Sequence, residues 1–462
     1  MDACTGGDTA VEIHRELERL ESAKSEIEHR ISELRCKLSQ LEKTVPNGVD
    51  HGAYLSVTTG SSLPPEMVYR YSRHLILPSF GVQGQVKLLK ASILVVGAGG
   101  LGSPAILYLG ASGVGRLGII DHDIVEMNNM HRQVIHTESF IGKPKVKSAA
   151  SACRSINSKI EIVEHQEPLR ASNALEIMNE YDIIVDATDN APSRYMISDC
   201  CVVLGKPLVS GAALGMEGQL TVYNHYGGPC YRCLFPVPPP TTACQRCADS
   251  GVLGVVPGII GCLQALEAIK IASGIGDPLS GRMVLFDALS GRIRVVKIRG
   301  KSQGCEVCGE KSSFTRNVFR NFDYEKFTHT SLSTAPLKLN LLPEESRITN
   351  KEFHEKAVRG EAHILLDVRP SHHFKIVSLP NALNIPLPSL QDRLAELKAA
   401  IKDEDDKNGS RSDTNLYVIC RRGNDSQRAV QLLQKFGFPS AKDVIGGLEG
   451  WAHDVDPNFP TY

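Results

Sequence analysis

The chain has 462 residues, about three times the roughly 150 residues of a typical domain, so we expect two or three folded units. Its 42% hydrophobic and 22% charged content is typical of globular proteins and excludes a wholly disordered or collagen-like chain. Lysine and arginine number 51 against 52 aspartates and glutamates, so no overall positive charge favours direct binding of nucleic acid.

The thirteen cysteines favour thiol or metal chemistry in a reducing compartment. The N-terminus, MDACTGGDTAVE, has neither a basic start nor an apolar signal core, so we expect a cytosolic protein. Residues 91–115 carry no charge and are numerous enough to span a bilayer. Their many glycines instead indicate a short strand, a glycine turn and a helix, so we expect no membrane segment.

Residues 1–43 are predicted to form a coiled-coil helix. The a/d spacing of four and three is followed by Ile13, Leu17, Leu20, Lys24, Ile27, Ile31, Leu34, Leu38 and Leu41. Just over four heptads is near the lower useful length, so a solitary amphipathic helix on its own domain is the alternative. Residues 44–65 are rich in Gly, Pro, Ser and Thr and are predicted to be a linker.

Two α/β domains are expected after this linker. In residues 66–315, strand-like runs such as SILVVGAGG, RLGIID, KIEIVEH, YDIIVDATD, PLVSGAA, QLTVYNH and RMVLFDA alternate with helical patterns. This alternation predicts a Rossmann-like sheet with helices on both faces. A second linker is expected at 316–345. Residues 346–462, with HILLDVR, ALNIPL, NLYVIC and KDVIGG, are predicted to form a smaller α/β domain.

The first domain begins with a nucleotide-binding pattern. GxGxxG at Gly97–Gly102 stands between an apolar strand and a helix, where glycines let phosphate approach the backbone and helix amides meet its charge. Asp121 ends the next strand, where a carboxylate can accept hydrogen bonds from ribose hydroxyls. Alone, this pattern suggests a dinucleotide and hydride transfer.

The residues that follow favour a triphosphate. The amides, cations and carboxylate concerned are Asn128, Asn129, Arg132, Lys145, Asp189 and Asn190. Cations neutralise phosphate oxygens and a carboxylate holds magnesium, which a nicotinamide enzyme does not need. Taken singly, each could instead be a surface salt-bridge or capping residue, which is the less favoured alternative.

Two CxxC pairs suit a structural zinc ion. Their four cysteines are Cys230, Cys233, Cys305 and Cys308. Because 71 residues separate the pairs, the ion would join two distant segments of one domain. A redox dithiol is the alternative, but neither pair starts a thioredoxin-like helix.

Cys420 ends a buried strand in YVICRRGNDS and precedes a short loop and a helix. Inward loop amides and the helix N-terminus favour an anionic sulfur, so we expect a lowered thiol pKa. A cysteine phosphatase needs an arginine six positions later, where this chain has Ser426, and Arg428 is out of register. Arg421 and Arg422 would add positive potential for an anionic donor or an acidic carrier protein.

Together these motifs carry a family resemblance. RYSRHLILP, GAGGLGSP, DHDIVEMNNMHRQ, GKPK, DATDN and GPCYRCLFP resemble the molybdopterin-synthase adenylyltransferase and ThiF group, relatives of ubiquitin-activating enzymes. The Cys420 loop, DVR, PNALNIP and GGLEGW resemble a rhodanese domain, whose cysteine carries a persulfide. Over residues 66–462 the order resembles the eukaryotic molybdenum cofactor synthesis family that joins an adenylyltransferase to a sulfurtransferase.

The resemblance implies an ATP site. By motif, its residues would be Gly100, Asp121, Asn128, Asn129, Met130, His131, Arg132, Lys145, Asp189 and Asn190. Asp189 would hold Mg²⁺, and Arg73 would reach the phosphate site of a partner subunit, which implies a homodimer. Relatives often have Ser-Asn-Leu-Ala-Arg where this chain has Asn-Asn-Met-His-Arg; Asn129 and Arg132 keep the polar contacts.

A third CxxC pair, Cys244 and Cys247, could replace either zinc pair. It lies in PVPPPTTACQRCADSG, a proline-rich segment expected to be an exposed loop. A thiol there can move to an acyl-adenylate, whereas a zinc ligand is pinned. By resemblance on CADSG, Cys247 would be the thioester-forming cysteine, with Cys244 as the alternative nucleophile.

The implied activity is ATP-dependent adenylation of the C-terminal glycine of ubiquitin-like sulfur carriers, followed by sulfur transfer from Cys420 to form a thiocarboxylate. The carriers would be the small subunit of molybdopterin synthase and a ubiquitin-related modifier used in thiolating tRNA wobble uridine. A cysteine desulfurase or other donor would supply sulfur. The order of thioester and persulfide steps stays open. The alternatives are an activating enzyme for protein conjugation with a docking-only rhodanese domain, and a nicotinamide oxidoreductase.

Overall fold

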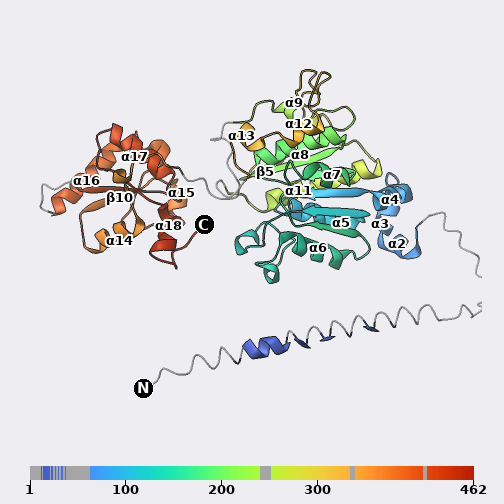
Figure 1. The fold of residues 1–462 in the computed structure, drawn as a ribbon, viewed down its shortest axis with the longest axis horizontal. Coiled ribbons are helices and arrows are strands. Elements are labelled where there is room, and N and C mark those ends of the chain that lie inside the picture. Colours follow the sequence, from blue (N-terminus) through green and yellow to red (C-terminus); the bar gives the residue numbers. More distant parts are fainter. Residues whose placement is uncertain are drawn as a thin grey trace, which may run out of the picture.

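The structure is a computed structural model that describes scattered positions between 12 and 37 and then the residues 63–239, 251–332, 339–408 and 414–462. The described N-terminal positions are helical and are drawn in dark blue in Figure 1. Of the expected coiled-coil seam, Leu17, Leu20, Ile27 and Leu34 are exposed in the single chain. Pairing of this helix with a second copy stays a prediction.

The first domain contains an eight-stranded sheet with helices on both faces (Figure 1). Its spatial order is β3 (Glu161–His165), β2 (Arg116–Ile120), β1 (Ser92–Val96), β4 (Ile183–Asp186), β5 (Leu208–Leu214), β6 (Glu217–Tyr223), β7 (Arg282–Asp287) and β8 (Arg292–Lys297). The pairs from β3 to β5 are parallel, and those from β5 to β8 are antiparallel.

Strand alternation sends side chains of β1 into two cores. Ile93 and Val95 join one buried cluster, whereas Leu94 and Val96 join the other. The first face is covered by α5 (Gly102–Ser112), α6 (Lys145–Ile156) and α11 (Val255–Ser273), and the second by α7 (Ala174–Asn179) and α8 (Ala191–Leu204). The remaining described helices of this domain between residues 63 and 239 are α2 (Pro65–Arg70), α3 (Ser72–Leu75), α4 (Gly81–Lys90), η1 (Met127–Asn129), η2 (Glu138–Phe140) and α9 (Tyr231–Leu234).

Helix α11 is apolar and long enough, by length and composition, to cross a membrane. It packs against α5, β5 and β6, and Ile260, Ala265 and Ala268 are buried in the same core as β1. Helices in protein cores pass the same test. Packing on the sheet therefore accounts for the composition of α11.

The segment after residue 315 differs from the expected linker. It forms α12 (Arg316–Arg320) and α13 (Tyr324–Thr328), capped by Thr315 and Asp323. Phe319 is fully buried, and the Tyr324 hydroxyl donates to Asp199 on α8 over 2.9 Å. Burial of these aromatic side chains fixes the segment on the first domain.

Residues 339–345, at the C-terminal end of the expected linker, belong to the second domain. Leu342 is buried in its core, and the Leu339 and Leu341 amides donate to Asn424 and Gln427 of the second domain. The described residues between 316 and 345 thus pack mostly on one domain or the other.

The second domain is a five-stranded parallel sheet between helices. Its spatial order is β11 (Leu383–Asn384), β10 (His363–Asp367), β12 (Asn415–Ile419), β13 (Lys442–Val444) and β9 (Arg347–Ile348). Its helices are η4 (Glu344–Ser346), α14 (Asn350–Val358), α15 (Ser371–Phe374), η5 (Leu387–Ser389), α16 (Leu394–Asn408), α17 (Asp425–Lys435) and α18 (Gly447–Asp454).

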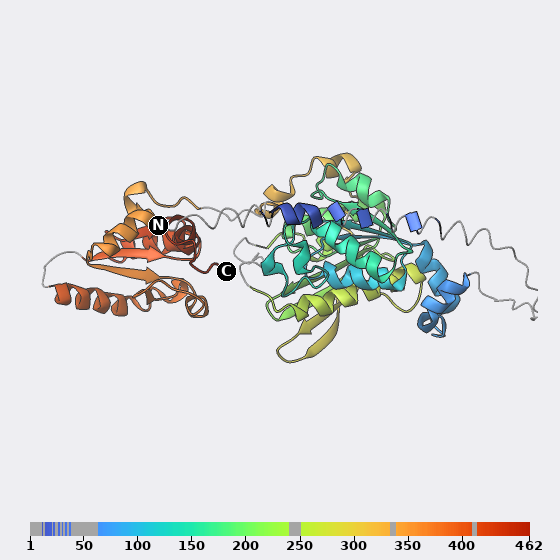
Figure 2. The same ribbon diagram turned by 90° about the horizontal axis from the view of Figure 1, so that it is seen from below.

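The predicted α/β class of both domains is confirmed, and every strand-like run named from the sequence contains a strand. Strands β8 and β9 were not among those runs. The β7–β8 hairpin extends from the first domain in the view of Figure 2. Its second strand is largely exposed, with a burial pattern that lacks the buried run typical of central strands.

Candidate functional site

The turn after β1 requires glycine for close backbone approach. Gly97 has φ of 99°, and a Cβ there would lie 2.9 Å from the carbonyl oxygen of Ala187. A Cβ on Gly102 would overlap the carbonyl oxygen of Gly97. Only glycine fits both positions, and α5 begins at the turn with its N-terminus where a phosphate would lie.

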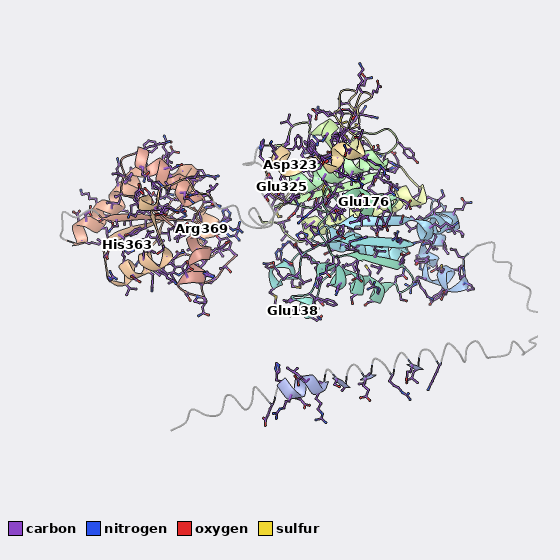
Figure 3. The ribbon with its side chains drawn as sticks, in the orientation of Figure 1. Glu138, Glu176, Asp323, Glu325, His363 and Arg369 are labelled. Carbon is purple, nitrogen blue, oxygen red and sulfur yellow. The ribbon has the colours of Figure 1, made fainter. Side chains whose placement is uncertain are left out.

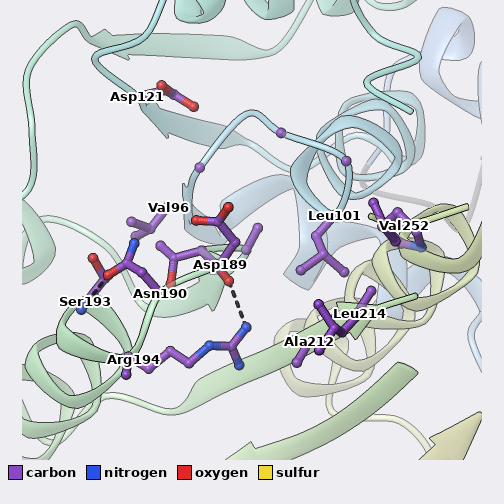
Figure 4. Close-up of a pocket in the computed structure, with 18 of the residues that line it drawn as sticks. Val96, Leu101, Asp121, Asp189, Asn190, Ser193, Arg194, Ala212, Leu214 and Val252 are labelled. Atoms are coloured by element: carbon purple, nitrogen blue, oxygen red, sulfur yellow. Dashed lines mark hydrogen bonds between the residues drawn. The ribbon is translucent and has the colours of Figure 1, made fainter. Parts of the chain in front are cut away.

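A cavity of about 1840 Å³ lies at the carboxyl ends of β1 and β4 (Figure 4). The chain leaves β1 for β2 and β3 before it returns to β4, and ligands of such sheets bind where the strand order reverses. The cavity lining includes the expected ATP residues Gly100, Asp121, Asn128, Asn129, His131, Arg132, Lys145, Asp189 and Asn190. The fold thus brings segments from three strand ends to one cavity.

Two expected contacts lie elsewhere in the single chain. Arg73 is exposed on α3 and is not among the described residues that line this cavity. Met130 is half-buried and is not among them either. A role for Arg73 in a partner's site stays a prediction.

Asp121 holds the glycine turn in place. One carboxylate oxygen accepts the Ala98 amide over 2.8 Å, and the other accepts the Asp123 amide over 2.8 Å. The ammonium of Lys145 lies 3.0 Å from the Asp123 carboxylate, and its side chain is only 8% exposed. A nearly buried cation beside the turn suits a phosphate oxygen.

The Asn128–Arg132 segment is locked by its own side chains. Asn129 is buried; its amide donates to the Asn128 side chain over 2.5 Å, and its oxygen accepts the Glu126 amide over 3.2 Å. The Arg132 guanidinium donates to the Asn128 carbonyl over 2.7 Å. These bonds hold Arg132 at the cavity wall.

Arg194 and Gln133 are among the lining residues that sequence reasoning missed. Arg194 on α8 donates to the Thr188 carbonyl over 2.7 Å (Figure 4). Burial opposes its charge, but Asp186 and Asp189 nearby raise the pKa of Arg194 above its ordinary value. Gln133 is buried, and its side-chain oxygen has no hydrogen-bond partner among the described residues. The only sequence feature that could have indicated these two residues is their position close to predicted site residues. Gln133 directly follows Arg132, and Arg194 lies four residues after Asn190.

The four cysteines of the two CxxC pairs meet in space. The Sγ atoms of Cys230 and Cys233 are 3.7 Å apart, those of Cys230 and Cys305 3.6 Å, and those of Cys233 and Cys308 3.3 Å. All four lie within 4.8 Å of one another. Tetrahedral Zn–S bonds of about 2.3 Å place sulfurs roughly 3.8 Å apart. The cluster fits zinc and joins the two distant segments.

Arg232, between two of these cysteines, anchors the cluster to the domain. Its guanidinium binds the Asp199 carboxylate through both Nε and Nη2, at 3.0 and 2.8 Å. Phe327 and Phe322 rings lie 4.3 and 4.8 Å from the guanidinium carbon. The cysteine cluster is therefore packed against α8 and α13.

The third CxxC pair, Cys244 and Cys247, lies outside the described residues. The thioester role expected of Cys247, and the alternative role of Cys244, stay predictions.

Cys420 lies in a closed loop between β12 and α17. Its sulfur accepts the Gly423 amide over 3.2 Å and lies 3.2 Å from the Ser426 hydroxyl. The residue is only 3% exposed. Burial raises the pKa of the Cys420 thiol, although the hydrogen bonds from Ser426 act in the opposite direction. The sequence predicted a lowered pKa, but the pKa is raised, because desolvation of the buried sulfur outweighs the hydrogen bonds of the loop.

The DVR motif, Asp367 to Arg369, lies at the end of β10 and supports the chain beside the Cys420 loop. Asp367 is fully buried and accepts from the Arg369 guanidinium, with Nε at 3.0 Å and Nη2 at 2.6 Å. Arg369, labelled in Figure 3, also donates to the Val377 carbonyl and the Tyr462 hydroxyl, at 2.7 and 2.8 Å. The pair fixes the chain after β10 next to the Cys420 loop.

Comparison with known proteins gives the class to which this architecture belongs. The ThiF family profile matches residues 71–307, and the rhodanese-like domain profile matches residues 349–454. The molecule is thus an enzyme in which a ThiF-type adenylating domain precedes a rhodanese-type sulfur-transferring domain.

Relatives that match over nearly the whole chain specify the family. "Adenylyltransferase and sulfurtransferase MOCS3" of Arabidopsis thaliana is 66% identical over 465 residues, 99% of each chain. The Danio rerio protein of the same name is 44% identical over 456 residues, 96% of this chain and 98% of that protein. The chain belongs to this MOCS3 family of adenylyltransferases and sulfurtransferases. Among solved structures, E. coli MccB with MccA-N7isoASN has a TM-score of 0.47 and 25% identity over 53% of this chain and 75% of that chain.

Proposed function

We propose that the enzyme adenylates the C-terminal glycine of a ubiquitin-like sulfur carrier with ATP and then converts it to a thiocarboxylate with sulfur carried on Cys420. The observation that carries this proposal is the presence in one chain of a phosphate-suited cavity and a rhodanese-type thiol loop. A carboxylate is a poor electrophile, and a mixed anhydride with AMP has a good leaving group. Lys145 and Arg132 line the cavity and would stabilise charge on the departing pyrophosphate.

The proposed sulfur transfer takes two displacement steps. The terminal sulfur of the Cys420 persulfide attacks the acyl carbon, and AMP leaves with the electron pair of the broken anhydride bond. A second thiol then attacks the Cys420 sulfur, which releases the carrier thiocarboxylate and leaves a disulfide for a cellular thiol reductant. We propose Cys247 for this second thiol or for a carrier thioester.

Two metal ions complete the proposal. Asp189 lines the cavity and would hold Mg²⁺, which neutralises phosphate charge when bound. The four clustered cysteines would hold a structural Zn²⁺. Neither ion takes part in the sulfur step.

The partners follow from the chemistry and from exposed side chains. We propose a cytosolic homodimer that serves the small subunit of molybdopterin synthase and a ubiquitin-related modifier of tRNA thiolation, with a cysteine desulfurase as donor. Apolar side chains around Arg73 support a second copy there: Tyr69, Ile76 and Leu77 are 87%, 68% and 50% exposed. Sedimentation equilibrium tests this part and should give the mass of two chains; a single-chain mass would contradict it.

Carrier-dependent exchange of pyrophosphate into ATP tests the adenylation proposal. Exchange should require a carrier that ends in Gly-Gly and should vanish when its last glycine is removed. Exchange without thiocarboxylate would favour the conjugation alternative, and no exchange would exclude adenylation of such carriers.

A further inference from the structure

The two arginines that directly follow Cys420 in the loop share one carboxylate. The Nε atoms of Arg421 and Arg422 each donate to the same oxygen of Glu449 over 2.9 Å. All three side chains are partly buried, at 19%, 24% and 34% exposure. Glu449 therefore offsets positive charge on the loop that carries the Cys420 thiol.

The backbone fixes Glu449 in this position. The Leu448 and Glu449 amides donate to the carbonyls of Cys420 and Arg421, each over 3.0 Å. A Cβ on Gly447 would overlap the Cys420 carbonyl oxygen, so the start of α18 touches the loop directly. The carboxylate is thus tied to the loop through its own main chain.

Tyr462 restrains the other side of Arg421. Its ring lies 4.8 Å from the Arg421 guanidinium carbon, within range of a cation–π contact. Its hydroxyl accepts from Arg369, which the buried Asp367 holds. Arg421 is therefore placed between a carboxylate and an aromatic ring.

This charge arrangement bears on which sulfur donors Cys420 can use. A small dianionic donor binds through nearby cations, and a fixed carboxylate both pairs with those cations and repels the dianion. A persulfide on another protein brings one negative charge and gains affinity from the wider protein surface. We propose that Glu449 is a specificity-determining residue that weakens binding of free dianionic sulfur donors and so favours a protein-borne persulfide.

Thiosulfate is the probe of this proposal. The Cys420 thiolate attacks its outer sulfur, a new Cys–S–S⁻ bond forms, and sulfite leaves with the electron pair of the broken S–S bond. Cyanide then removes the outer sulfur as thiocyanate and restores the thiolate. The cycle needs no other oxidant or reductant.

The test compares full-length Glu449→Gln with wild type in thiocyanate formation. The KM for thiosulfate should fall about tenfold while kcat changes little, because the variant removes repulsion but leaves the sulfur chemistry intact. Sulfur loading of Cys420 by a cysteine desulfurase with free cysteine, followed by mass spectrometry, should keep its wild-type rate. Glu355→Gln is the matched control, because Glu355 forms an exposed pair with Arg359 on α14.

A second variant, Glu449→Asp, keeps the proposal testable if Glu449→Gln does not fold. Glu449→Asp keeps the charge but shortens its reach to the two arginines, so its KM for thiosulfate should fall by less than that of Glu449→Gln. If thermal melting shows Glu449→Gln unfolded, Glu449→Asp decides alone. An unchanged or higher KM in the folded variants, or an equal fall in Glu355→Gln, would overturn the proposal.

Discussion

The nucleotide cavity and the Cys420 loop have a common plan and opposite exposure. Each begins where a parallel strand ends and a helix starts, β1 into α5 and β12 into α17. The cavity is wide and takes side chains from several separate segments. The thiol is nearly enclosed, and its nearest polar partners come from the next six residues.

This difference shows how each site can fail. A cavity that distributes charge over many segments loses transition-state stabilisation in steps as single groups are removed. A loop built around one sulfur loses its reaction entirely when that sulfur is removed. Substitutions in one region should leave the other active, since they lie in domains with separate cores.

The largest effect is expected for Cys420→Ala. Sulfur transfer from thiosulfate should fall at least about a thousandfold, because alanine cannot hold a persulfide. Carrier-dependent pyrophosphate exchange should be unchanged. Cys262→Ala, at a half-buried cysteine on α11, is the control and should keep both activities. Residual thiocyanate formation in Cys420→Ala would mean that another thiol carries the sulfur.

The reciprocal variant is Asp189→Asn in the cavity. Pyrophosphate exchange should fall about a hundredfold, because the carboxylate is the proposed magnesium ligand at the cavity. Thiocyanate formation should stay at the wild-type level. Glu138→Gln, at an exposed carboxylate labelled in Figure 3, is the control. Equal exchange in Asp189→Asn and wild type would exclude the proposed metal role.

Cys305→Ala tests the cysteine cluster, which belongs to neither reaction. The variant should lose zinc, measured by atomic emission, and should melt roughly 10 °C lower, because a structural ion stabilises only the folded domain. Cys247→Ala should keep zinc and wild-type melting. Zinc loss in Cys247→Ala and retention in Cys305→Ala would reverse the assignment of the pairs.

The smallest effect concerns pH. Burial raises the pKa of the Cys420 thiol, and the thiolate is the nucleophile, so single-turnover persulfide formation from thiosulfate should rise about tenfold per pH unit below that pKa. Ser426 lowers the pKa by hydrogen bonding. Ser426→Ala should therefore move the profile to higher pH. A profile flat from pH 6 upward, roughly two units below an ordinary thiol pKa, would show a lowered pKa instead.

The contrast between the sites also explains what could be predicted from the sequence. The glycine turn, Asp121 and the Cys420 loop are local patterns with fixed spacing, and they lie where the strand order indicates. The packing of Phe319 and Tyr324 on α8 could not be predicted, because it joins residues far apart in sequence. For the same reason the bond of Glu449 to both loop arginines was not foreseen. The raised pKa of Cys420 depends on burial by the whole domain.

We propose that one carrier glycine is activated by the first domain and sulfurated from Cys420 of the second. The most direct test is intact-mass spectrometry of a Gly-Gly carrier incubated with the enzyme, ATP, magnesium and a persulfide donor. We expect replacement of one carrier oxygen by sulfur with wild type, and none with Cys420→Ala or without ATP. Sulfur incorporation by Cys420→Ala, or in the absence of ATP, would contradict it.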